Sequence, residues 1–142
     1  MRVTPGGPDA SRVHARNHSF DVGQQASFRD ADPCPSAIEL ALGALGGDLA
    51  SGWRIEAQRR GIALEEIELT LRCRLDDPLR HAGVVGASGH AGIAAIEGTI
   101  YVTADRGEEE LEAAWREVRE RSPLFTTFSR CVAVHLDLHV IH

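Results

Sequence analysis

A single carboxylate stands in an otherwise apolar stretch of the chain. Between Leu40 and Leu49 the only charged residue is Asp48. A carboxylate buried without a partner is costly, or it takes up a proton instead. Two interpretations of Asp48 are therefore open: a solvent-facing or hydrogen-bonded structural residue, or a carboxylate that binds a ligand or transfers protons.

A second group of chemically capable residues lies near the end of the chain, where His135, Asp137 and His139 alternate along one segment. Two imidazoles and a carboxylate are plausible metal ligands. Alternate residues of a strand lie about 6.6–7 Å apart, so all three would have to bend toward one ion. We interpret the trio as a solvated outer face, with a metal site as the alternative, and expect no cofactor.

The three cysteines, Cys34, Cys73 and Cys131, are widely spaced, and none forms a C-x-x-C motif. This usage argues against a disulfide framework or a cysteine-rich zinc site and favours a cytoplasmic protein. The first residues lack the apolar core of a signal peptide, and no apolar run approaches the roughly 18 residues of a membrane span. A formal net charge of −6 disfavours nucleic acid as a partner.

The elements that would position these residues begin with a long helix. Ser36 and Glu39 form a capping box, S-x-x-E, directly before an apolar run, and Gly61 suits a helix C-terminus. We predict a helix over residues 37–60. Its first half is apolar on almost every side, which predicts burial all round. A homodimer would supply that burial, with close approach at Gly43, Gly46 and Gly47.

Period-two alternation predicts strands at 64–75, 93–104 and 131–141, with Cys73 on the buried face of the first. A strand pair at 11–29 and a frayed tail at 1–10 precede the long helix, and a loop is expected at 76–92. Helices are predicted at 107–121 and 123–129, separated at Ser122, which suits an N-cap before Pro123. This order of elements indicates the α+β class.

Three segments carry a family pattern in the same order. Residues 37–50 read Ala-Ile-Glu-Leu-Ala-Leu-Gly-Ala-Leu-Gly-Gly-Asp-Leu-Ala, residues 61–67 read Gly-Ile-Ala-Leu-Glu-Glu-Ile, and residues 122–128 read Ser-Pro-Leu-Phe-Thr-Thr-Phe. They resemble the P-x-E-L-L-x-A-L-G-G-C-L-A helix, the G-I-x-L-x-x-I strand and the C-P-V turn of the OsmC/Ohr family. The resemblance covers roughly residues 11–141. It implies one OsmC-like domain over 11–142, with a long buried central helix, a curved antiparallel sheet and an intertwined homodimer.

Many proteins of that family are thiol-dependent hydroperoxide reductases, and the resemblance matches their two cysteines to Asp48 and Ser122. Peroxide reduction by this route needs a thiolate nucleophile and a second thiol. A carboxylate and a hydroxyl supply neither. The glutamate that assists in some members matches Glu39, and the assisting arginine would be Arg16 or Arg29. The resemblance also implies a pocket at the dimer interface near Asp48, Ser122 and Glu39.

We therefore expect a divergent OsmC-like protein without thiol peroxidase activity, which binds a small ligand or has an accessory role in stress response and peroxide resistance. The alternative is an enzyme. It would reduce hydroperoxides or thiols through Cys34, Cys73 or Cys131, or use Asp48 as an acid or base.

One contact follows from this hypothesis. If the fold holds, Ser122 is the expected hydrogen-bond donor to Asp48, and the pair would be a fixed polar replacement for a redox switch. Both Ser122, as an N-cap, and Glu39, as the capping-box partner of Ser36, also have purely structural interpretations.

Overall fold

The computed structural model describes residues 1–24 and 34–141, which form two compact units, Met1–Gly43 and Ala44–His142. Its mixture of helices and strands confirms the predicted α+β class. In chain order the elements are β1 (Arg2–Pro5), β2 (Ala10–Ala15), β3 (His18–Gly23), α1 (Ala37–Arg60), β4 (Leu64–Leu75), α2 (Pro78–His81), β5 (Ile93–Ala104), α3 (Glu108–Arg121), α4 (Pro123–Phe128) and β6 (Ala133–Ile141).

The first unit contains an antiparallel sheet in the order β1-β2-β3. β2 and β3 confirm the predicted strand pair up to residue 23, and residues 25–29 of that prediction lie outside the described residues. The tail expected over residues 1–10 differs, because β1 pairs with β2 along its whole length. Arg12 and Asp21 form a bidentate ion pair across β2 and β3, at 2.8 and 2.7 Å.

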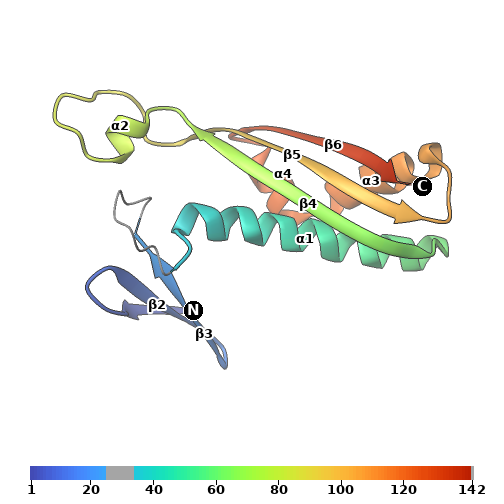
Figure 1. Cartoon of the computed structure of the whole chain (residues 1–142), viewed down its shortest axis with the longest axis horizontal. Coiled ribbons are helices and arrows are strands. Elements are labelled where there is room, and N and C mark those ends of the chain that lie inside the picture. Colours follow the sequence, from blue (N-terminus) through green and yellow to red (C-terminus); the bar gives the residue numbers. More distant parts are fainter. Residues whose placement is uncertain (25–33, 142) are drawn as a thin grey trace. The chain divides into compact units, whose positions relative to one another are not determined.

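The second unit contains the sheet β4-β5-β6, whose strands lie side by side in Figure 1. β4 and β5 are antiparallel, but β6 runs parallel to β5. The antiparallel sheet that the resemblance implied is therefore wrong for β6. The physical reason is the connection between β5 and β6. It contains α3 and α4, which return the chain to the end of the sheet where β5 began, as a parallel crossover requires. The loop expected at 76–92 also contains the short helix α2, which is capped by Asp77.

α1 confirms the predicted helix at both ends. The backbone N–H and the hydroxyl of Ser36 both donate to Glu39 Oε2 at 2.7 Å, and Glu39 N donates to Ser36 Oγ at 3.3 Å. At the other end Gly61 adopts a φ of 66°, and Ile62 N donates to Ala57 O at 2.9 Å. These are the capping box and the left-handed terminus that the sequence indicated.

Within this single chain α1 is buried on one side and exposed on another, so the predicted burial all round still depends on the expected second copy. Leu45, Leu49 and Trp53 are fully buried, whereas Gly47 and Ser51 are exposed and Ile55 is 60% exposed. The core of the single chain therefore buries only some of the residues of α1.

The buried side of α1 packs against α3 and the inner face of the sheet. Trp53 of α1 and Trp115 of α3 stack with their ring centroids 6.0 Å apart and their planes 5° from parallel. A side chain at Gly46 would come within 3.3 Å of Leu71 on β4, and one at Gly52 within 3.0 Å of Val118 on α3. Both glycines thus allow α1 to approach its neighbours closely.

Trp53→Ala tests this packing. Removing one fully buried indole from the stack leaves a cavity, so the free energy of unfolding should fall by about 3–5 kcal/mol. Urea unfolding at matched protein concentration measures the change. The neighbouring exposed residue provides the control, because Arg54→Ala should change stability by no more than about 0.5 kcal/mol. Equal effects of the two substitutions would contradict the assignment of the core.

Candidate functional site

Ser122 and Asp48 are joined by a hydrogen bond, as the sequence predicted. Ser122 Oγ donates to Asp48 Oδ2 at 2.6 Å, between residues 74 positions apart in the chain. The contact holds the junction of α3 and α4 against the middle of α1. The predicted hydrogen bond between these two side chains is thus confirmed.

Ser122 is also the N-cap of α4, which confirms its structural interpretation. Its Oγ accepts a hydrogen bond from Phe125 N at 2.9 Å, and Pro123 follows at the first helical position. The side chain is only 5% exposed. Both the hydroxyl proton and one lone pair of Ser122 are therefore occupied, which leaves it poorly placed to act as a nucleophile.

Asp48 is half-buried, and one edge of its carboxylate is fixed. Oδ2 accepts from Leu124 N at 3.2 Å as well as from Ser122 Oγ. Among the described residues no donor contacts Oδ1. The carboxylate is thus oriented by two donors and keeps one free acceptor atom.

That carboxylate lines a pocket of about 270 Å³ between α1 and the end of α3. The polar part of the wall is formed by Asp48, Ser51, Glu56, Arg121 and Ser122, and the apolar part by Gly52, Ile55 and Val118. A cavity of this size, with a few convergent polar groups on an apolar wall, has the character of a small-ligand site.

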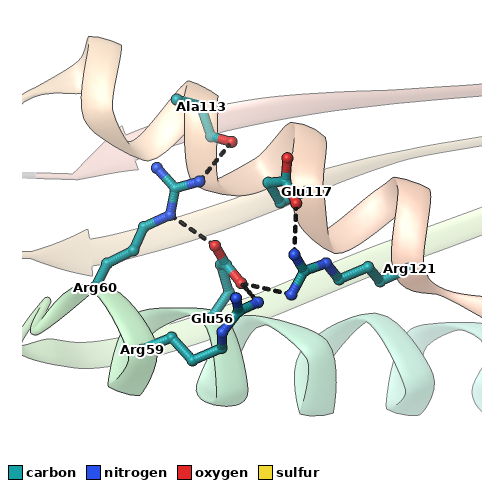
Figure 2. A network of polar contacts seen from close by, with 6 residues as sticks. All are labelled: Glu56, Arg59, Arg60, Ala113, Glu117 and Arg121. Carbon is teal, nitrogen blue, oxygen red and sulfur yellow. Dashed lines mark hydrogen bonds and ion pairs between the residues drawn. The ribbon is translucent and has the colours of Figure 1, made fainter.

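Glu56 is the centre of a charge network beside the pocket (Figure 2). Its side chain accepts from Arg60 Nε at 2.7 Å and Arg59 Nη1 at 3.0 Å, and Arg121 Nη1 lies 3.6 Å away. Arg121 also reaches Glu117 at 3.0 Å. The network joins the last turns of α1 to α3, and Arg121 extends it to the pocket wall.

The network determines the ionisation of Glu56, which is only 5% exposed. The hydrogen bond from Arg60 lowers the pKa of Glu56, the pairing with Arg59 acts in the same direction, and burial opposes them. Sequence reasoning missed Glu56 and Arg121, because both fall on segments that look like solvated helix faces. The spacing of Glu56 to Arg59 and Arg60 was a visible signal, whereas the distant partner Arg121 was not.

The remaining residues that the resemblance matched to the family site belong to the first unit or fall outside the described residues. Glu39 belongs to the first unit, where hydrogen bonds from the Ser36 hydroxyl and backbone lower its pKa. Arg16 is an exposed residue in the turn between β2 and β3, with a φ of 59°. Arg29 falls outside the described residues.

Neither Cys73 nor Cys131, the cysteines of the second unit, lines this pocket. Cys73 lies half-buried on β4, and burial raises the pKa of its thiol, which makes the reactive thiolate less available. Cys131 is exposed after α4, with Sγ 3.5 Å from Thr127 O, and Cys34 belongs to the first unit. All three are free thiols.

His135, Asp137 and His139 are exposed on the outer face of β6, as the alternation predicted. The ring of His139 instead contacts Tyr101, with the centroids 5.6 Å apart. Across residues 1–24 and 34–141, no group of three or more His, Cys, Asp or Glu side chains is arranged to hold a metal ion. The structure therefore does not gather the trio into a metal site. The helices in the same described ranges are also too short or too polar to span a membrane.

Comparison with known proteins places this geometry in a family context. Residues 29–137 match the sequence model of a family described as OsmC-like protein. Similar solved structures include the OsmC-like protein from Mycoplasma pneumoniae, with a TM-score of 0.79 and 12% identity over 94% of this chain and 89% of that one. These findings confirm the family resemblance and the OsmC-like fold.

Two further structures carry names that refer to hydroperoxides. The organic hydroperoxide resistance protein OhrB of Bacillus subtilis has a TM-score of 0.66 and 18% identity, over 97% of this chain and 96% of that one. An organic hydroperoxide resistance protein OsmC from Legionella pneumophila has a TM-score of 0.67 and 15% identity, over 96% and 93% of the two chains. No curated protein matches the chain.

The Glu56 network makes a prediction about stability and pH. Glu56→Gln should lower the free energy of unfolding by about 3 kcal/mol at pH 7, because it removes the charge that three arginines surround. The folded-state pKa of Glu56 is lowered, so its stabilisation is present above the unfolded-state value of about 4.3 and is lost as the pH falls below it. The difference between wild type and variant in urea unfolding should therefore shrink below that pH.

Glu117→Gln is the matched control for this experiment. The Glu117 side chain is 37% exposed and contacts only the outer part of the network, so its loss should cost at most about 1 kcal/mol. A difference for Glu56→Gln that stays constant from pH 7 down to about pH 2, well below the unfolded-state pKa, would show that the carboxylate charge is not what stabilises the junction.

Proposed function

We propose, from the premise that this chain belongs to the OsmC-like protein family, that it binds a small ligand beside Asp48 and lacks thiol peroxidase activity. The proposal includes a cytoplasmic, accessory role in stress response. The two hydroperoxide resistance proteins share its fold. The activity in their names is that of those proteins and is not assigned to this chain.

The observation that carries the proposal is the 2.6 Å hydrogen bond between Ser122 and Asp48. The family resemblance matches these two positions to the cysteines of thiol-dependent members. A carboxylate and a hydroxyl cannot attack a peroxide and close a disulfide, because that route requires two sulfur atoms. The pocket persists beside the pair, but its walls contain no sulfur. A pocket without its redox groups supports binding rather than peroxide reduction.

A homodimer is the second part of the proposal. Gly47, Ser51 and Ile55 present a small and apolar face of α1 to solvent. Apolar surface of this kind is stabilised when a second copy covers it. Since Ser51 and Ile55 also line the pocket, a second α1 packed on this face would lie at the pocket mouth.

Hydroperoxide consumption tests the first part. With a dithiol reductant, the purified protein should reduce an organic hydroperoxide no faster than buffer does. An Asp48→Cys/Ser122→Cys variant should gain turnover, because the two side chains already touch and would place two thiols within reach of each other. Peroxide loss measured over time provides the readout for both proteins.

Alkylation of the free thiols is the control. Turnover by the wild type that disappears when Cys34, Cys73 and Cys131 are blocked would overturn the proposal and show that one of these residues is the nucleophile. Alkylation should otherwise leave the wild-type result unchanged.

Gly47→Glu tests the homodimer. Among the described residues a Cβ at Gly47 would have no neighbour within 4 Å, so a second copy packed on this face would be what opposes the added carboxylate. Sedimentation velocity should show a dimeric wild type and a variant whose dimer dissociates at least about tenfold more readily, since a buried, unpaired charge is costly. Gly107→Glu adds the same side chain in another open position and should leave the dimer intact. A wild type that sediments as a monomer would refute this part.

A further inference from the structure

We infer that the pocket beside Asp48 selects a small primary ammonium compound with a short aliphatic tail. The inference rests on the proposed ligand-binding function and names the ligand class of the same site. It follows from three properties of the wall: its free polar atoms, the state of its arginine and its apolar side.

Apart from the Arg121 guanidinium, the free polar atoms of the pocket are hydrogen-bond acceptors. Asp48 Oδ2 already has two donors, which leaves Oδ1 open. The Ser122 hydroxyl is occupied on both sides, and Ser51 Oγ donates its proton to Gly47 O at 2.8 Å, so it can only accept. A ligand that binds at Asp48 must therefore bring its own N–H or O–H donors, and an ammonium group brings three with a charge that complements the carboxylate.

Arg121, the arginine of the pocket, is already paired with carboxylates of the protein. Arg121 already lies between two carboxylates, Glu117 at 3.0 Å and Glu56 at 3.6 Å. A ligand carboxylate that approached this guanidinium would meet both glutamates at close range, and like charges disfavour each other there. The pocket thus offers a free acceptor to a cation at Asp48, whereas its arginine already has two carboxylate neighbours.

The opposite wall sets the size and shape of the ligand. Gly52, Ile55 and Val118 form an apolar surface, and the pocket volume is about 270 Å³. Water occupies about 30 Å³ per molecule in the liquid, so the space suits on the order of nine water-sized groups. A single charged head with an aliphatic tail of five or six carbons matches both the volume and the distribution of polarity.

Titration of the full-length protein with hexylammonium, hexanoate and hexan-1-ol tests the inference, because the three probes share one tail and differ in the head. Ligand-observed NMR gives the dissociation constants. We expect hexylammonium to bind at least about tenfold more tightly than either other probe, which is the scale of one charge-assisted hydrogen bond. Asp48→Asn, which keeps the shape and removes the charge, should abolish this preference.

Glu117→Gln reports on the second property of the wall. The substitution removes the negative charge of one of the two carboxylates beside Arg121. It should therefore raise the affinity for hexanoate at least about threefold, because less negative charge repels the ligand there. Glu120→Gln removes the same charge from an exposed position on the same helix and outside the pocket, so it should leave the three affinities unchanged. Urea midpoints of all variants confirm that each is folded.

The outcomes separate the ligand class from the function on which it rests. Hexanoate or hexan-1-ol binding as tightly as hexylammonium, or an Asp48→Asn variant that keeps the preference, overturns the ammonium assignment and leaves ligand binding standing. Failure of all three probes to bind overturns both the assignment and the proposed binding function. The absence of peroxidase activity is judged separately by hydroperoxide consumption.

Discussion

The second unit depends on the junction between α1 and α3. On one side of it two indoles, Trp53 and Trp115, stack in the core. On the other the buried carboxylate of Glu56 is held by arginines from both helices. A buried charge is tolerable only when its partners are in place, so the two helices can meet in one arrangement. The pocket wall and the contact between Asp48 and Ser122 are consequences of that arrangement.

Local signals in the sequence were sufficient for most of the elements and for both ends of α1. The capping box at Ser36 and the glycine at position 61 located both ends of α1, because helix termini are specified by nearby residues. The pairing of Asp48 with Ser122 came from a family resemblance, since 74 positions separate the two residues and no periodicity connects them. The antiparallel pairing that the resemblance implied is wrong for β6. Alternation could not correct it, because alternation specifies the faces of a strand and says nothing about its direction.

The charged part of the site could not be predicted for a related reason. Glu56 lies in the polar half of α1 and Arg121 at the end of an amphipathic helix, and each looks like an ordinary surface residue until the helices are packed. Packing brings these side chains into one network, in which hydrogen bonds from Arg60 and Arg59 lower the pKa of Glu56 and Arg121 is shared between two glutamates. Tertiary packing, rather than residue type, therefore distinguishes them from the many other charged residues of the chain.

The parallel pairing of β5 with β6 has a consequence for how the protein is made. Ala95 pairs with Ala133 and Thr103 with Ile141, so one edge of β5 has no partner until α3, α4 and β6 have been synthesised. During translation that open edge is a template for pairing with other chains. Closing it requires contacts between residues far apart in the sequence, which form late and slowly. The nine-residue strand β6 thus completes the sheet and covers the edge at which a nascent chain could pair with another chain.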